Sequence, residues 1–297
     1  MGKLASPIFK GCATALATPF RDGEIDFESF KKMIERQIAS GVSALVICGT
    51  TGEASTMSVD EHLACVEVAV ETVRGRIPVI AGSGSNCTKK SITLSKASCE
   101  LGADALLVVT PYYNKASEAG LIKHFLSIAD SVEKPLILYN VPTRTGVSIS
   151  LPVYESLAEH DNIVAVKEAS GNISQIIALA SRLGDKLDIY SGNDDQILPI
   201  LSIGGAGVIS VVSNLVPSDV ERLCKVYFSG DTKLAKELQL SLIDLISTMF
   251  CEVNPIPLKH ALSLMGVCMD EMRLPLCEAS PESRIKIKKS LLEHGLI

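Results

Sequence analysis

The stretch NIVAVKEASGN, residues 162–172, contains a short apolar run that ends at a lysine. Residues 163–166 are continuously apolar, which is typical of a strand buried on both faces of a parallel sheet. Lys167 stands at the carboxyl end of this run. Lys167 is either a solvated strand terminus paired with an acid such as Glu168, or a reactive amine. The other motifs of the chain are needed to distinguish these two interpretations.

Apolar runs of the same kind recur at fairly even intervals along the chain. They are ATALAT (13–18), ALVIC (44–48), PVIAG (78–82), ALLVVT (105–110), LILYN (136–140), IVAVK (163–167), LDIYS (187–191) and GVISV (207–211). Segments with helical periodicity lie between them. Eight strands, each followed by a helix, predict an α/β fold of the (β/α)8 or TIM barrel type.

Capping residues indicate where several of these helices begin. Helix starts are predicted at Asp26, at the capping box Ser58–Glu61, at Thr88 and at the capping box Ser218–Glu221.

The strand pattern stops after about residue 228, and only helical segments follow at 231–250, 257–265 and 280–293. No linker rich in Pro or Gly precedes them. We therefore expect a catalytic barrel, 1–228, with a C-terminal helical region, 229–297, packed on it.

Composition excludes several classes of function. The 28 basic and 34 acidic residues give a net charge of −6, with no basic patch for nucleic acid. No apolar run approaches the roughly 20 residues of a membrane span, and MGKLASPIFKG (1–11) lacks the apolar core of a signal peptide. The nine cysteines are dispersed without CxxC spacing, and the five histidines form no HExxH. We expect a reduced cytoplasmic protein with no disulfides and no metal.

The carboxyl ends of the predicted strands carry the reactive side chains. These ends are GTTGE (49–53), PYYNK (111–115), YNVPTRTG (139–146), KEASGN (167–172), SGNDD (191–195) and IS (209–210). In such barrels these ends meet on one face, which here collects a lysine, hydroxyls of Thr and Tyr, and an arginine. This set lacks histidine and metal-ligand carboxylates and favours imine chemistry.

Lys167 has a plausible partner for that chemistry. An ordinary lysine amine has a pKa of about 10.4, and an apolar environment penalises its charged form, which leaves neutral amine to attack a ketone. Tyr139 ends the neighbouring strand, where its phenol could move protons on the adduct. Taken alone, a strand-end lysine is more often a solvated ion pair, and a tyrosine more often a core aromatic.

The sequence leaves two possible roles open for each of two further groups, and it predicts one role for a third. The GTTGE turn either only precedes a helix or holds a carboxylate with its N–H groups and with Thr50 and Thr51. Arg144 is a solvated loop residue or a bidentate carboxylate ligand. Tyr112–Tyr113 is predicted, from the residues alone, to be a surface or interface pair.

Together these motifs resemble the class I pyruvate-aldolase family that includes dihydrodipicolinate synthase and N-acetylneuraminate lyase. The likeness runs from GCATALATPF (11–20) to EVNPIPLK (252–259), and GTTGE, PYYNK, LYNVPTRTG and VKEASGN are specific in combination. It implies that Lys167 forms a Schiff base with pyruvate, whose enamine then attacks aspartate 4-semialdehyde. No cofactor beyond this imine is implied.

The resemblance also implies roles for other residues. Tyr139, Thr50 and Tyr113 match the family's proton relay, in which Tyr113 crosses from a neighbouring subunit of a homotetramer built as a dimer of dimers. Thr51 matches the contact to the pyruvate carboxylate, and Arg144 matches the ligand of the semialdehyde carboxylate. Two further positions, Gly192 and Ile209, match residues that line the substrate site.

Arg144 favours condensation with aspartate 4-semialdehyde over the runner-up activities, cleavage of 2-keto-3-deoxy sugar acids or of N-acetylneuraminate. Several family members that are inhibited by lysine carry an acid in place of Lys90 and a histidine in place of Val59. We therefore expect weak or absent inhibition by L-lysine. A non-catalytic, phosphate-binding barrel is a rival class, because GGAGVIS (204–210) lies where many barrels bind phosphate; tight packing explains these glycines equally well.

Overall fold

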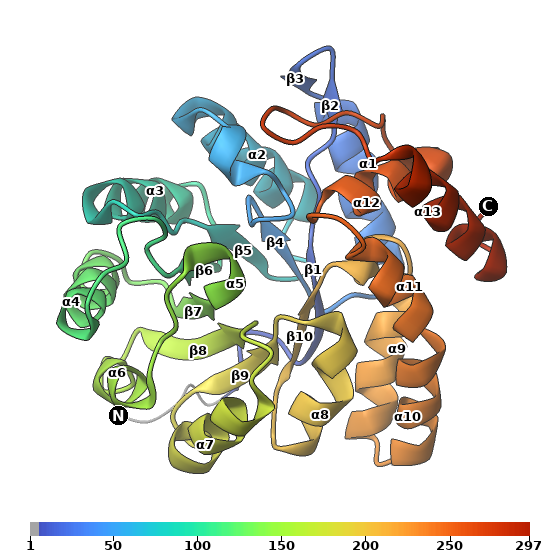
Figure 1. Ribbon diagram of the computed structural model, residues 1–297. Coiled ribbons are helices and arrows are strands. Elements are labelled where there is room, and N and C mark those ends of the chain that lie inside the picture. Colours follow the sequence, from blue (N-terminus) through green and yellow to red (C-terminus); the bar gives the residue numbers. More distant parts are fainter. Residues whose placement is uncertain (1–5) are drawn as a thin grey trace.

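The strands form a closed barrel of eight parallel strands in a computed structural model that describes residues 6–297 (Figure 1). They are β1 (Gly11–Ala15), β4 (Ala44–Ile47), β5 (Val79–Gly82), β6 (Ala105–Val109), β7 (Leu136–Asn140), β8 (Ile163–Glu168), β9 (Asp188–Ser191) and β10 (Gly207–Ser210). Each strand pairs with the next in sequence, and β10 pairs with β1. The predicted fold is confirmed. Residues 1–5, part of the predicted barrel domain and of the segment examined for a signal peptide, lie outside the described residues.

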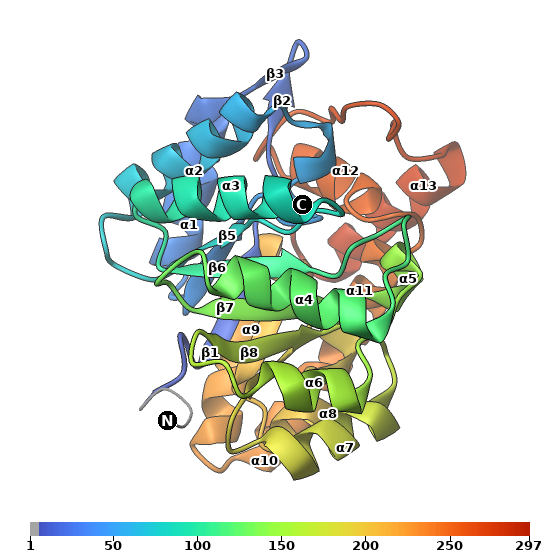
Figure 2. The same ribbon diagram turned by 90° about the vertical axis from the view of Figure 1, so that its left-hand side faces the viewer.

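Helices surround the barrel, as Figures 1 and 2 show from two sides. The helices are α1 (Phe27–Ala39), α2 (Val59–Val73), α3 (Thr88–Glu100), α4 (Glu118–Ala129), α5 (Pro142–Thr145), α6 (Leu151–Leu157), α7 (Ile173–Leu183), α8 (Ile197–Ser202) and α9 (Pro217–Phe228). Short 3-10 turns are η1 (Ala54–Thr56), η2 (Asp194–Gln196) and η3 (Val212–Asn214). A small ribbon of β2 (Phe20–Arg21) and β3 (Glu24–Ile25) follows β1 and was not predicted.

Helices alone follow α9, as expected. They are α10 (Thr232–Ser241), α11 (Ile243–Met249), α12 (Ile256–Leu264) and α13 (Pro281–Glu293). The helix predicted at 231–250 is divided at Leu242, which is buried in the core. α11 and α12 pack against α13, and both contact η3, which follows β10. The division of the chain into 1–228 and 229–297 stays a prediction. Across residues 6–297, no helix is both long and apolar enough to cross a membrane.

The core has two layers with different side chains. Small residues, many of them alanine, dominate inside the barrel, where Ile209 and Tyr139 also lie. Larger aliphatic and aromatic residues fill the layer between strands and helices. Because side chains of a strand alternate between its faces, neighbouring residues of one strand enter different layers.

Two predicted caps are confirmed. The side chain of Asp26 accepts a hydrogen bond from the backbone N–H of Ser29, and both bonds of the Ser58–Glu61 capping box are present. Such bonds satisfy backbone donors that the first turn leaves free.

Two other predicted caps are wrong. Thr88 is the first helical residue of α3, and its hydroxyl bonds to Nδ1 of His124. α9 begins at Pro217, and Glu221 is buried, accepting hydrogen bonds from the backbone N–H of Cys12 and from Ser43. Proline is favoured at the first helical position because its missing N–H would be unpaired there.

The glycines of GGAGVIS serve packing. Gly207 begins β10 opposite Gly11, and a Cβ on it would lie 1.9 Å from the Gly11 oxygen. A Cβ on Gly205 would lie 2.7 Å from the Ile200 oxygen. These contacts lie at the amino end of β10, at the opposite end of the barrel from Lys167. The phosphate-site interpretation therefore loses its support.

Candidate active site

Lys167 and Tyr139 lie side by side at the carboxyl ends of β8 and β7. The two residues are register partners, and the Lys167 Nζ lies 4.4 Å from the centroid of the Tyr139 ring. Their side chains are 5% and 6% exposed. Within residues 6–297 the Lys167 amine has neither an ion pair nor a hydrogen-bond partner. The predicted pair is thus brought together, with a buried amine whose protein contact is an aromatic face.

Glu168 does not pair with Lys167, because it points into the helix layer. Its fully buried carboxylate accepts hydrogen bonds from Asn140 Nδ2 at 3.0 and 3.1 Å, from the Tyr154 hydroxyl at 3.0 Å and from the Ser170 N–H at 2.9 Å. Burial, and then the Glu168 charge, raise the pKa of Tyr154 well above its ordinary value. The solvated ion pair considered for Lys167 is therefore excluded.

The charged neighbour of Lys167 is Asp194, in η2. Its Oδ2 accepts hydrogen bonds from the N–H groups of Val211 and Val212, each at 3.0 Å. Burial raises the pKa of Asp194, while these bonds, one from Ser210 and the positive charge of Lys167 act to lower it. A buried carboxylate thus acts on Lys167 electrostatically from outside ion-pair distance.

The GTTGE segment forms a tight turn after β4. Gly52 N–H donates to the Gly49 carbonyl, and Glu53, in the left-handed region at φ +55°, donates to the carbonyl of Thr50. The Glu53 carboxylate is fully buried in an ion pair of 2.7 Å with Lys259 of α12. Such a pair costs desolvation but fixes geometry, because a buried charge without its partner is strongly unfavourable.

Thr51 and Arg144 are both bound to Asn254, in the segment before α12. Asn254 Nδ2 donates to Thr51 Oγ1 at 3.0 Å, and Arg144 Nη2, on α5, donates to the Asn254 carbonyl at 3.2 Å. Asn254 is 5% exposed. Sequence reasoning missed this residue, which appeared only as part of the EVNPIPLK motif.

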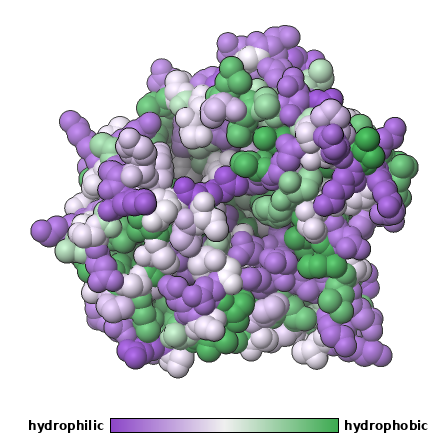
Figure 3. Space-filling view, in the orientation of Figure 1, coloured by the Kyte–Doolittle hydropathy of each residue, from purple (hydrophilic) through white to green (hydrophobic). Residues whose placement is uncertain are grey.

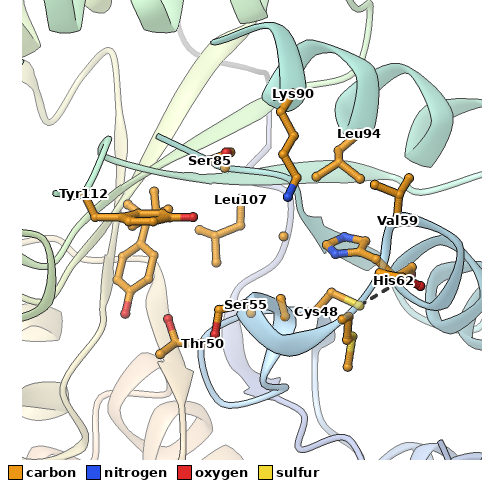
Figure 4. A pocket seen from close by; sticks show the side chains of 18 residues that line it. Cys48, Thr50, Ser55, Val59, His62, Ser85, Lys90, Leu94, Leu107 and Tyr112 are labelled. Atoms are coloured by element: carbon orange, nitrogen blue, oxygen red, sulfur yellow. Dashed lines mark hydrogen bonds between the residues drawn. The ribbon is translucent and has the colours of Figure 1, made fainter. Parts of the chain in front are cut away.

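A cavity of about 190 Å³ opens between the ends of β4, β5 and β6 (Figure 4). Thr50, Tyr112 and Tyr139 line one side. The molecular surface in the same orientation as Figure 1 is hollowed near its centre (Figure 3). Two side chains of the predicted relay, those of Thr50 and Tyr139, therefore share one space.

The other side of the cavity carries Lys90 from α3, and Val59 and His62 from α2 (Figure 4). No acidic residue is among the described residues that line it. Burial lowers the pKa of His62 to about 4, a bond to the Gly82 carbonyl acts to raise it, and the Lys90 charge lowers it further. The Nε2 atom of His62 is buried without a partner in the described chain.

The remaining predicted residues are more scattered. Tyr113 is 90% exposed, has φ of +72° and does not line this cavity, so its own chain does not bring it to Tyr139. Gly192 packs on Ala169, where a Cβ would meet the Ala169 Cβ at 2.6 Å, and Ile209 is buried inside the barrel. In residues 6–297 no three His, Cys, Asp or Glu side chains gather as a metal-ligand group.

Comparison with known proteins agrees with this geometry. Residues 8–294 match the dihydrodipicolinate synthetase family. The chain is 49% identical over 291 residues to 4-hydroxy-tetrahydrodipicolinate synthase of Clostridium tetani, covering 98% of this chain and 99% of that protein.

Two solved structures are also similar to the chain. One is the chloride-inhibited dihydrodipicolinate synthase of Acinetobacter baumannii complexed with pyruvate (TM-score 0.95, 42% identity, 97% and 99% coverage). The other is described as the first monomeric dihydrodipicolinate synthase variant (TM-score 0.94, 42% identity, 98% coverage of both chains).

Proposed function

Because the chain belongs to the dihydrodipicolinate synthetase family, we propose that it condenses pyruvate with L-aspartate 4-semialdehyde to 4-hydroxy-tetrahydrodipicolinate, in the diaminopimelate route to lysine. This is the chemistry of a class I, lysine-imine lyase. One observation carries the proposal: the Lys167 amine is buried at the barrel end against the Tyr139 ring, and no residue from 6 to 297 forms an ion pair with it. The neutral form of a lysine amine is a nucleophile for a ketone.

The reaction begins when the Lys167 nitrogen attacks the keto carbon of pyruvate. The resulting carbinolamine loses its oxygen as water, and the protonated imine that forms then loses a methyl proton to give an enamine. The enamine carbon attacks the aldehyde of the second substrate, whose oxygen takes up a proton, and the Lys167 imine is restored. The amino group of the second substrate then attacks the imine carbon, which closes the ring and releases Lys167 as a free amine. We assign the proton transfers to Tyr139, whose ring lies against the Lys167 amine, with Thr50 and with Tyr113 of a neighbouring subunit extending the relay.

Each substrate carries a carboxylate that needs a ligand. We assign the pyruvate carboxylate to Thr51 and the GTTGE backbone, and the semialdehyde carboxylate to Arg144, whose fork of donors suits that geometry. Gly192 and Ile209 are assigned to the walls of the site. The close packing of Gly192 on Ala169 leaves no room for a side chain at that wall.

We further propose a homotetramer, built as a dimer of dimers, working in the cytoplasm with no cofactor other than the pyruvate imine. The nearly complete exposure of Tyr113, on a residue held in the uncommon positive-φ region, supports a neighbouring subunit that this side chain could reach. The nine free cysteines are compatible with a reducing compartment. Sedimentation of the wild type and of Tyr113→Phe, with turnover of both, tests the assembly.

Borohydride reduction in the presence of pyruvate tests the nucleophile. The wild type is expected to gain the mass of one reduced pyruvyl group, located on Lys167 by peptide mapping, and Lys167→Ala is expected to gain none. Lys90→Ala is the matched control, because it removes a lysine from the cavity that Thr50 and Tyr139 line and should keep the adduct. An adduct on Lys167→Ala would overturn the assignment, and an unlabelled wild type would overturn imine chemistry.

The second substrate needs its own test. Coupled turnover with aspartate 4-semialdehyde is expected to exceed turnover of 2-keto-3-deoxy sugar acids and of N-acetylneuraminate by orders of magnitude. Arg144→Gln should raise the KM for the semialdehyde while leaving the imine with pyruvate intact. Preference for a sugar acid by the wild type would refute the assignment of the semialdehyde.

A further inference from the structure

We propose that Asn254 is a positioning residue that orients both carboxylate ligands, Thr51 with its side chain and Arg144 with its backbone. The proposal rests on the proposed function, because it assumes a carboxylate at each of these two residues. Asn254 lies outside the barrel strands, 203 residues after Thr51 in sequence, and nevertheless contacts both Thr51 and Arg144.

The side-chain contact determines which way the Thr51 hydroxyl can donate. A threonine hydroxyl has one donor and two acceptor positions. Asn254 Nδ2 occupies one acceptor position at 3.0 Å, in a place where Thr51 is 3% exposed and water is largely excluded. The hydroxyl hydrogen therefore turns away from Asn254 and is free to donate to a substrate carboxylate.

The backbone contact restrains the Arg144 side chain. Arg144 lies on the exposed surface of the four-residue helix α5, where its long side chain has many rotamers. The bond from Nη2 to the Asn254 carbonyl, 3.2 Å long, selects those that face the barrel end. Ordering this side chain before substrate arrives lowers the entropy cost of binding.

The segment that carries Asn254 is itself firmly held. Five residues later, Lys259 forms its fully buried ion pair with Glu53, two residues after Thr51. The Lys259 ammonium also lies 4.2 Å from the centroid of the Phe20 ring. Asn254 and Thr51 are therefore fixed relative to each other by contacts on both sides.

Two variants of Asn254 test the hydrogen bond from its side chain to Thr51. Asn254→Ala removes the donor to Thr51 and is expected to raise the pyruvate KM roughly 3- to 10-fold, as the loss of one buried hydrogen bond predicts. The semialdehyde KM should stay within about twofold, because the backbone carbonyl remains. Asn254→Asp, nearly isosteric, accepts the Thr51 hydroxyl hydrogen and adds a negative charge, so its pyruvate KM should rise further.

A double-mutant cycle shows whether Asn254 acts through Thr51. If it does, Thr51→Val and Thr51→Val/Asn254→Ala should have the same pyruvate KM, since the valine has no hydroxyl to orient. Additive effects would overturn the proposal. Asn162→Ala is the matched control: its amide also ties backbone segments together, bonding to the carbonyls of Ala129 and Val132, but at the amino end of β8. It should leave both KM values unchanged.

The inference would be overturned if both Asn254 variants fold and their pyruvate KM values lie within twofold of the wild-type value. Because that comparison is made with a wild type that turns over pyruvate, it leaves the proposed function standing; an inactive wild type would instead refute the function. Should the variants not fold, a crystal structure of the wild type with pyruvate decides. We expect Thr51 Oγ1 between Asn254 Nδ2 and the pyruvate carboxylate, and a hydroxyl turned away from the carboxylate would overturn the proposal.

Discussion

The inner and outer faces of β7 and β8 bury neighbouring residues in opposite ways. Tyr139 and Lys167 face the inside of the barrel, and the amine there has an aromatic ring as its contact. Asn140 and Glu168, one residue further along each strand, face the helix layer, where the carboxylate accepts hydrogen bonds from two side chains and a backbone N–H. The side chains on the two faces are buried to nearly the same extent, but among the described residues only the outer-face carboxylate has hydrogen-bond donors around it.

This difference distinguishes the structural carboxylate of Glu168 from the amine that we propose to be reactive. A buried charge with all its partners contributes to holding strands and helices in register, and its removal destabilises the fold. The Lys167 amine has no ion-pair or hydrogen-bond partner among residues 6–297, so it gives up no such contact when it reacts. In the proposed reaction it forms a covalent bond to pyruvate. Satisfaction of hydrogen bonds, rather than exposure, distinguishes Lys167 from Glu168.

The largest effect is expected on the inner face. Tyr139→Phe should lower kcat by about 10²- to 10⁴-fold, the range of a lost proton carrier, with little change in melting temperature. Steady-state kinetics and thermal unfolding of the same preparation measure both. A variant that keeps most of its kcat would remove Tyr139 from the relay and weaken the contrast between the faces.

Substitutions on the outer face are expected to lower the stability of the fold rather than the activity. Glu168→Gln replaces one acceptor oxygen by an N–H₂ group that faces other donors, and should cost about 3 kcal/mol or more, seen as a lower melting temperature. The pyruvate KM of the folded fraction should stay close to that of the wild type. Glu155→Gln, which only breaks a surface pair with Arg182, should shift stability by less than about 0.5 kcal/mol. Equal melting temperatures for the two variants would break the comparison.

His62 is an intermediate case, since one ring nitrogen has a partner and the other has none. Burial lowers its pKa from 6.5 to about 4, so the unfolded chain binds the proton more tightly. The stability it contributes is present above pH 6.5 and is lost as the pH falls towards 4, by about 2–4 kcal/mol in total. His62→Gln should therefore narrow the difference in melting temperature between pH 7.5 and pH 5. An unchanged difference would show that His62 is already charged or solvated.

The smallest effect concerns the far side of the cavity, where Lys90 stands without an acid among the lining residues. Its charge opposes the side-chain ammonium of L-lysine, so the wild type should keep nearly all its activity in millimolar L-lysine. Lys90→Glu should gain measurable inhibition, about fivefold in affinity for roughly 1 kcal/mol of changed charge interaction. Lys89→Glu, next to it but outside the cavity lining, is the control. Strong inhibition of the wild type would refute the prediction.

The barrel was predictable because its strands are apolar on both faces and follow one another along the chain. Strand order then placed Tyr139 beside Lys167 without further information. Local capping rules failed where a tertiary contact uses the same side chain. Glu221 has the spacing of a capping residue, but its carboxylate accepts hydrogen bonds from Cys12 and Ser43 instead. No periodicity or local spacing indicates such a contact.

The site was predictable only where strands carry it. Asn254 lies 87 residues beyond Lys167, outside the strand pattern, and its two contacts depend on how the C-terminal helices pack. Tyr113 illustrates a different limit: it lies on the loop where the sequence placed it, but its proposed role requires a neighbouring subunit. Contacts between segments distant in sequence, or between chains, have no signature in one sequence.

The ion pair between Glu53 and Lys259 also sets an order of events during synthesis. A ribosome adds roughly 5–20 residues per second, so Lys259 is made some 10–40 s after Glu53, from which it is separated by 206 positions. Until then the turn that carries Thr51 has a carboxylate without its cation, and Asn254 arrives only five residues earlier. A nascent chain therefore completes its last barrel strand, which ends at Ser210, before the ion pair that holds this turn can form.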